Sequence, residues 1–202
     1  MKTERLQALA DGVFAIALTL LVLALPVPRG SRDLAHDLLR QWPFYAAYTV
    51  SFVTVAIVWL NHHALMDLLA RADRTLVELN LLLLLFVALV PWPTRLLAEY
   101  LRNSDQSSAA AVTYGIVMMS MAASFTGVWL WLGRSLHLAH PHARLRVPAA
   151  IRRSLLGPPV YAAGALIALA SAPAAFALYA FVAVFYAVSG RGAGRQPEEI
   201  AI

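Results

Sequence analysis

The sequence contains no cysteine and very little charge. The absence of cysteine excludes disulfide bonds, thiolate zinc sites and thiol nucleophiles. Charged residues make up 13% of the 202 positions and apolar residues 60%, whereas soluble domains carry about 25% charged and about 45–50% apolar residues. So few polar side chains cannot cover a surface that faces water. The composition therefore predicts an integral membrane protein.

Lysine is almost absent too, because Lys2 is the single lysine among 16 basic residues. The net charge of +5 can indicate nucleic-acid binding. The arginines, however, lie in short segments between apolar runs and form no basic stripe interleaved with aromatic side chains. Membrane topology explains this distribution better, and no nucleic-acid partner is expected.

Long apolar runs predict an all-α membrane protein with six transmembrane helices, since a helix needs about 20 apolar residues to cross the bilayer. Between residues 154 and 190 there is no charged residue, and one helix of that length would reach roughly 55 Å. The Ser171-Ala172-Pro173 segment is therefore expected to be a turn between two shorter spans. The first four spans are expected at about residues 6–25, 42–60, 76–90 and 109–132.

The six spans are expected to form one transmembrane domain over residues 1–190, followed by a short cytoplasmic tail over 191–202. With the N-terminus inside, the inner segments hold eleven basic residues and the outer loops five. The positive-inside rule then places both termini in the cytoplasm, for a multi-pass protein of the cell (inner) membrane. Asp11, inside the first run, argues against a cleaved signal peptide. The five outer basic residues are Arg29, Arg32, Arg40, Arg95 and Arg102.

Polar residues occur at membrane depth near the inner ends of the first three spans. Ionisable side chains in hydrocarbon are costly and usually face protein partners, so a carboxylate here is expected to pair with guanidinium or imidazole groups. Two compatible interpretations stay open: a structural clamp that pins three helices, or a network coupled to pH or gating. The expected members are Arg5, Asp11, Trp59, His62, His63 and Asn80.

One side of the first span carries an apolar stripe of Val13, Ile16, Leu20 and Leu23, at spacings of three, four and three residues. Thr19 lies about 60° from Ile16 around a helix, and Asp11 points about 140° away, towards the rest of the subunit. Periodicity alone favours contact of this stripe with lipid or with the subunit core over a pore lining.

Three segments, in order, resemble motifs of the transmembrane protein 175 family, the lysosomal potassium channels and their bacterial relatives. The first span matches the family's Arg-x-x-x-Phe-Ser-Asp signature at Arg5 and Asp11, with Leu9 and Ala10 in place of the Phe and Ser. Residues 51–63 are similar to its Ser-Phe to Trp-x-x-His pattern, and residues 80–94 resemble its Asn-Leu to Pro-x-Pro-Thr pattern. The resemblance is strong in the first half of the chain.

This resemblance implies a homotetramer around the first helices that conducts potassium, and other monovalent cations less well, without a cofactor. No TVGYG filter is present. The family's constriction is apolar and corresponds here to Ile16, Leu20 and Leu23, with Thr19 adding a hydroxyl layer. Arg5 and Asp11 would bond within the subunit and support the pore helix. Leu9 and Ala10 remove a hydroxyl from that network.

Alternative functions are a small secondary transporter, a proton-leak pathway through Asp11 and the histidines, and a membrane-embedded acyltransferase. The run from His62 to Asp67 spells His-His-x-x-x-Asp, which looks like the general-base motif of some acyltransferases. Leu68 replaces the usual Gly, and the rest of such an enzyme is lacking, so no catalytic residue is expected.

A transporter is expected to carry buried charge at the bilayer midplane, where this sequence has little, and no inverted repeat is evident. Metal binding is not expected either. His63 and Asp67 supply two ligands, too few for a good site. We interpret His137, His140 and His142 as part of a solvated loop.

Overall fold

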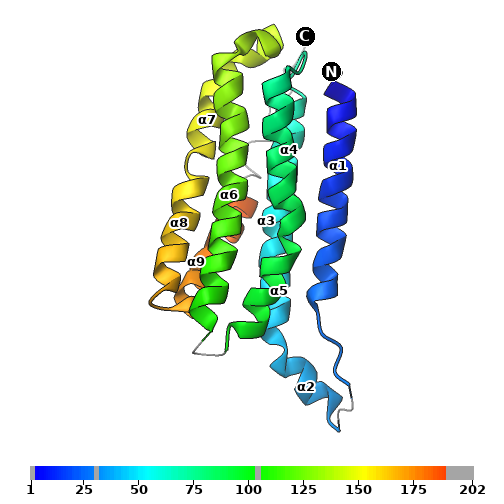
Figure 1. Cartoon of the computed structure of the whole chain (residues 1–202), viewed down its shortest axis with the longest axis vertical. Coiled ribbons are helices and arrows are strands. Elements are labelled where there is room, and N and C mark those ends of the chain that lie inside the picture. Colours follow the sequence, from blue (N-terminus) through cyan, green and yellow to red (C-terminus); the bar gives the residue numbers. More distant parts are fainter. Residues whose placement is uncertain (1–2, 30–31, 103–105, 190–202) are drawn as a thin grey trace, which may run out of the picture.

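The computed structural model describes residues 3–29, 32–102 and 106–189. Over these residues the chain is built of helices that run along a common axis (Figure 1). Four stretches are long and apolar enough to cross a membrane. They are α1 (Thr3–Leu20) continued by the 3₁₀ turn η1 (Leu21–Ala24), α3 (Trp42–Met66), α4 (Arg74–Leu89) with α5 (Pro91–Tyr100), and α6 (Ser107–Arg134).

The second half of the chain contains shorter helices. The 3₁₀ turns η2 (Leu136–Leu138) and η3 (Pro141–Arg146) lead into α7 (Val147–Ser154), α8 (Gly157–Ala168) and α9 (Ala172–Ser189). A turn over residues 169–171 separates α8 from α9, as the Ser171-Ala172-Pro173 segment predicted. A short helix, α2 (Leu34–Arg40), projects beyond the end of the bundle at which α1 ends (Figure 1). The expected tail over 191–202 lies outside the described residues.

The third span does not end at Pro91, where the sequence predicted a break. Val90 separates α4 from α5, and the helical path continues to Tyr100. Pro91 and Pro93 occupy the first turn of α5, where a helix does not need their missing N–H groups. Hydrogen bonds from Val90 N to Val87 O and from Thr94 N to Val90 O, both 3.2 Å, carry the chain across the junction.

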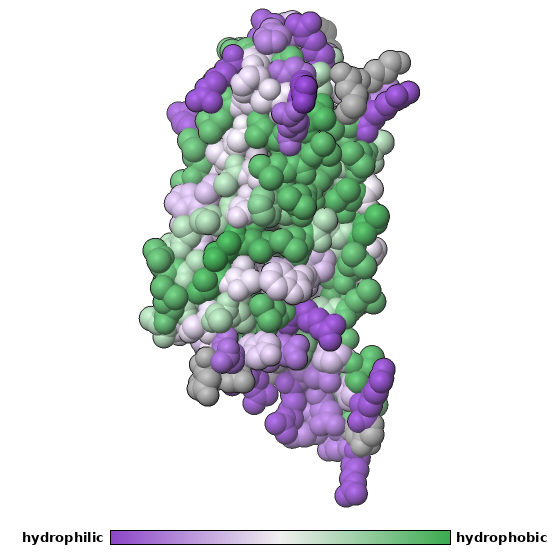
Figure 2. Space-filling view, viewed as in Figure 1, coloured by the Kyte–Doolittle hydropathy of each residue, from purple (hydrophilic) through white to green (hydrophobic). Residues whose placement is uncertain are grey.

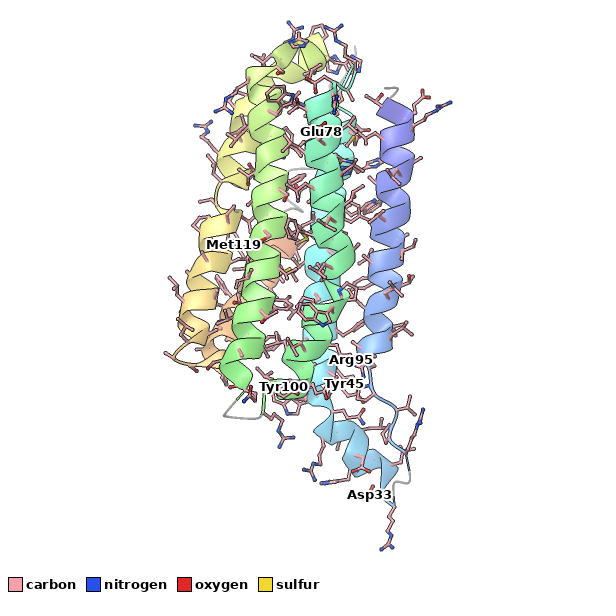
Figure 3. The ribbon with its side chains drawn as sticks, in the orientation of Figure 1. Asp33, Tyr45, Glu78, Arg95, Tyr100 and Met119 are labelled. Carbon is pink, nitrogen blue, oxygen red and sulfur yellow. The ribbon has the colours of Figure 1, made fainter. Side chains whose placement is uncertain are left out.

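The surface of the molecule matches a membrane protein. Figure 2 shows a broad apolar band around the middle, with hydrophilic residues gathered at both ends. Figure 3 places Glu78 near one end and Arg95 and Tyr100 near the other, on consecutive parts of the same span. We call the end formed by the start of α1 and by η2, η3 and α7 the arginine-rich end; it carries Arg134, Arg144, Arg146, Arg152 and Arg153.

Loops at the arginine-rich end are tied together by main-chain and side-chain hydrogen bonds. Leu69 and Ala139 form an isolated antiparallel bridge. Asp73 caps α4 by accepting from Leu76 N at 2.8 Å, and its carboxylate also accepts from Trp131 Nε1 at 3.0 Å. The N-terminus of α4 is therefore attached to the C-terminal part of α6.

The packing of α8 and α9 against α6 depends on two glycines. Tyr179 of α9 is fully buried, and its ring lies 5.1 Å from that of Tyr114 on α6. A Cβ atom at Gly164 or at Gly115 would collide with the Tyr179 side chain. Both positions must therefore lack a side chain for the aromatic cluster to form.

We predict that Gly164→Ala destabilises the protein by about 1–3 kcal/mol, because the added methyl group overpacks the Tyr179 site. Thermal unfolding in detergent measures the effect as a lower Tm. Gly127→Ala is the control, since a Cβ there would meet Leu79 Cδ2 at an ordinary 3.6 Å. Equal Tm values for the two variants would contradict this account of the packing.

Candidate pore helix and its polar support

The α1 helix lies at the edge of the bundle, packed against α3 and α4 (Figure 1). Its inward face consists of Leu6, Ala10, Phe14 and Ala17, all buried and spaced four, four and three residues apart. This spacing places the four side chains on one stripe of the helix. The opposite side of α1 is left uncovered by the described residues.

Three residues of the predicted stripe, Ile16, Leu20 and Leu23, lie on the uncovered side, whereas Val13 is partly buried and packs against the core of the subunit. Exposed fractions are 60% for Ile16, 42% for Leu20 and 69% for Leu23, and Thr19 is exposed beside them. The Thr19 hydroxyl donates to the carbonyl of Ile16 at 2.9 Å or of Ala15 at 3.0 Å. Because its proton is used by the helix, the lone pairs of this oxygen remain available as acceptors.

On its inward side, α1 is bound to α3 by two polar contacts. Trp59 Nε1 donates to Asp11 Oδ1 at 2.9 Å, and Gln7 Nε2 donates to His63 Nδ1 at 3.2 Å. The Trp59 and His63 rings lie 5.8 Å apart. Asp11 is half-buried and points away from Ile16, as predicted from the helix geometry.

A third contact joins α3 to α4 deeper in the bundle. His62 and Asn80 are fully buried, and His62 Nε2 lies 2.7 Å from Asn80 Oδ1, so that the imidazole N–H donates and the amide oxygen accepts. Phe14 of α1 packs 5.5 Å from the His62 ring. Within the described residues His62 Nδ1 and Asn80 Nδ2 have no hydrogen-bond partner.

The structure does not bring Arg5 into this network. Arg5 is exposed and makes no hydrogen bond or ion pair with any described residue, and the Asp11 carboxylate accepts from Trp59 instead. Six residues of helix place Arg5 and Asp11 about 120° apart around the axis. The two side chains therefore leave α1 on different faces.

The two histidines of the His-His-x-x-x-Asp run have different surroundings. His62 is buried against Asn80, whereas His63 is exposed and lies 4.0 Å from the exposed Asp67. Neighbouring helical residues point about 100° apart, so the run does not form one site. No group of three or more metal-binding side chains occurs among the residues that the structure describes.

A second polar cluster, which the sequence analysis missed, lies at the other end of the bundle. Thr94 Oγ1 of α5 donates to Ser51 Oγ of α3 at 2.8 Å, and Ser51 Oγ lies 3.1 Å from the Tyr114 hydroxyl of α6. All three side chains are buried. Ser51 begins one of the quoted motifs and Thr94 ends another. Because α3 and α4–α5 run in opposite directions, these two motif ends meet.

Comparison with known proteins identifies the family. Residues 5–91 match the family described as endosomal/lysosomal potassium channel TMEM175. Over 188 residues, 92% of this chain and 91% of the relative, the sequence is 46% identical to a potassium channel of Streptomyces collinus (strain DSM 40733 / Tue 365). The endosomal/lysosomal proton channel TMEM175 of Gallus gallus is 32% identical over 157 residues, which are 71% of this chain and 31% of that protein.

A solved structure has the same fold. The crystal structure of a lysosomal potassium-selective channel TMEM175 homologue from Chamaesiphon minutus aligns with a TM-score of 0.84 and 34% identity. This alignment covers 93% of the present chain and 97% of the other. The match to the Streptomyces protein extends over nearly the whole of both chains. The chain is therefore a multi-pass membrane protein that belongs to the TMEM175 family.

Proposed function

We propose that this chain forms a homotetrameric, potassium-permeable channel of the cell (inner) membrane, with four copies of α1 around the conduction path. The observation that carries the proposal is the uncovered apolar face of α1, in a chain whose full-length bacterial relative is named a potassium channel. Potassium and other monovalent cations are the permeant species, and no cofactor takes part.

Helix lengths support six crossings per subunit in one domain over residues 1–190. The α7–α8 arm spans residues 147–168, but α7 carries Arg152 and Arg153, so its uncharged part over residues 154–168 covers about 22 Å at 1.5 Å per residue. The 18 residues of α9 cover about 27 Å. The α9 length is close to the hydrocarbon thickness of about 30 Å, and the length over 154–168 fits the short span expected from the sequence. Six crossings return the chain to its starting side, and the arginines of the arginine-rich end favour the cytoplasm for both termini.

The uncovered face of α1 carries the small residues that close packing of several α1 helices around one axis requires. Beside the apolar stripe it exposes the small residues Ala8, Gly12 and Ala15, and a Cβ at Gly12 would meet no atom within 4 Å. Small residues at spacings of four and three let a neighbouring membrane helix approach closely. A second copy of α1 can therefore pack there while Ile16, Leu20 and Leu23 point to the axis.

Three rings, each of four such side chains, make an effective barrier to ions. A narrow apolar ring does not hold water continuously, so an ion must lose hydration without replacement oxygens. The barrier is lower for potassium than for sodium because potassium loses its hydration more cheaply. The Thr19 oxygens offer acceptors between the apolar layers.

Two other functions receive less support. Among the described residues no Asp, Glu, Lys or Arg is fully buried, which disfavours a transporter built on a midplane ion pair. The relatives are named channels, and the separated histidines disfavour acyl transfer. Proton permeation is the second candidate, because the Gallus gallus relative is named a proton channel and Asp11 and His63 lie close to Trp59.

We predict that Ile16→Asn and Leu23→Ala each raise single-channel potassium conductance several-fold and weaken the preference for potassium over sodium. The polar or smaller side chain lets water remain in the constriction. Reconstituted channels in planar bilayers provide the measurement, and a pH gradient in the same experiment tests for proton current. Leu166→Ala, at a leucine of α8 that is 68% exposed, is the matched control. Currents unchanged from the parent would remove these residues from the pore.

The assembly is testable because the chain has no cysteine. A single Leu23→Cys substitution is expected to give disulfide-linked dimers on oxidation in lipid, since four copies of this position surround one axis. Leu166→Cys is expected to remain monomeric on the same denaturing gel. Cross-linking at Leu166 without cross-linking at Leu23, or a monomeric particle in nanodiscs, would refute the proposed arrangement.

We assign the polar contacts to a clamp that holds three helices together: Asp11, Trp59 and His63 join α1 to α3, and His62 and Asn80 join α3 to α4. Trp59→Phe is expected to cost about 1 kcal/mol of stability by removing the hydrogen bond to Asp11, and to change open probability while the permeability ratio stays constant. Trp92→Phe, at a tryptophan that is 56% exposed, is the control for thermal unfolding and recordings. A shifted pH dependence of opening in Trp59→Phe would instead indicate a titrating network.

A further inference from the structure

A groove that conduction does not use opens between α3 and the α7–α8 arm. Its volume is about 630 Å³, with α6 behind it and α9 at its far end. The lining is mainly apolar and includes Ile57, Val58, Phe125, Ala150 and Val182. The groove lies on a different part of the subunit from the uncovered face of α1.

The groove is part of the packed structure. The α7–α8 arm breaks after Ser154, and the carbonyl freed there accepts a hydrogen bond from Thr126 Oγ1 of α6 at 2.8 Å. Gly157, which begins α8, lies so close to α6 that a Cβ atom would be 3.1 Å from Ala122 Cβ. The arm therefore packs against α6 on both sides of the break, through Gly157 of α8 at Ala122 and through Ile151 of α7 at Gly133.

The mouth of the groove carries positive charge. Arg146 of η3 and Arg153 of α7 line it, and the lining residues that the structure describes include no carboxylate. Neither arginine forms an ion pair or hydrogen bond with a residue in the described ranges. Leu145, which is 91% exposed, also lines this mouth, so an apolar side chain lies beside the two guanidinium groups.

The length of the groove fits one leaflet of a bilayer. On α3 the lining runs from Ala64 to Thr54, about 15 Å at 1.5 Å per residue, and Leu68 extends it beyond the end of the helix. Half of a hydrocarbon core is about 15 Å thick, and the interfacial region adds to it. A chain of methylene groups that starts at the arginines would reach the middle of the membrane.

We propose that this groove binds a phospholipid with an anionic headgroup from the leaflet at the arginine-rich end. One acyl chain lies along α3 and α6, and the phosphate accepts hydrogen bonds from Arg146 and Arg153. Arginine makes strong charge-assisted bonds to phosphate, and basic pockets between membrane helices bind anionic headgroups. Since no carboxylate among the described lining residues could receive the amine of a zwitterionic lipid, a headgroup of net negative charge fits best.

The test titrates the full-length protein in detergent with phosphatidylglycerol or phosphatidylcholine of identical acyl chains and counts bound lipids by native mass spectrometry. We expect Arg146→Gln with Arg153→Gln to weaken phosphatidylglycerol binding roughly thirtyfold, about fivefold for each cation. Arg144→Gln with Arg152→Gln removes the same charge at the same end from residues outside the groove, and is expected to leave binding within twofold. Inorganic phosphate is not expected to compete.

A second pair of variants tests the groove without changing charge. Ala64 is exposed and lines the groove, so Ala64→Phe is expected to fill it and reduce phosphatidylglycerol binding at least tenfold. Ala163→Phe, at an exposed alanine of α8 outside the groove, is expected to bind as the parent does. Thermal unfolding of each variant without lipid identifies any variant that does not fold. In that case the other pair of variants tests the proposal.

Three results would overturn the proposal. One is equal binding of phosphatidylcholine and phosphatidylglycerol, and another is an equal loss in the control variants. The third is an Ala64→Cys cross-link between two subunits, which would assign the groove to a second copy of the chain. Lipid binding is measured without ion flux, so its outcome is independent of the channel proposal.

Discussion

The rotation of α1 about its own axis is the constraint on which the functional interpretation depends. Inside a bilayer a polar side chain must find its partner within the protein, and α1 finds two on α3: Trp59 for Asp11 and His63 for Gln7. These contacts hold one side of α1 against the bundle. The apolar stripe that contains Ile16 lies on the side of α1 away from Asp11. These contacts therefore turn the stripe away from the rest of the subunit.

The two polar clusters hold α3 at both of its ends. Near the arginine-rich end His62 reaches Asn80 of α4, and near the opposite end Ser51 is bonded to Thr94 of α5. Tyr114 extends the second cluster to α6, where the tyrosine and glycine packing of α8 and α9 begins. The support of α1 is thus continuous with the second half of the chain, which carries the groove.

Hydropathy was sufficient to predict the four long spans, because length and apolar content decide whether a segment can cross a bilayer. It was misleading at Pro91, since a proline in the first turn of a new helix does not interrupt the path. Ionisable residues at membrane depth predicted the polar cluster near the arginine-rich end. Ser51, Thr94 and Tyr114 did not stand out because single hydroxyl groups are common in membrane helices, and only the fold shows that they meet. The groove depends on the break after Ser154, which no spacing in the sequence revealed.

The bridge at Leu69 and Ala139 has a consequence for how this architecture evolves. Ala70 N donates to Leu138 O at 2.8 Å, and His140 N donates to Leu68 O at 2.9 Å, so the two loops are fastened by groups that every amino acid except proline supplies. These main-chain hydrogen bonds do not depend on which side chain each residue carries. Substitutions at exposed loop positions such as Ala70 can therefore reshape the face presented to the aqueous phase without breaking these bonds, whereas Leu69, Leu138 and Ala139 are buried and also hold the loops together by packing.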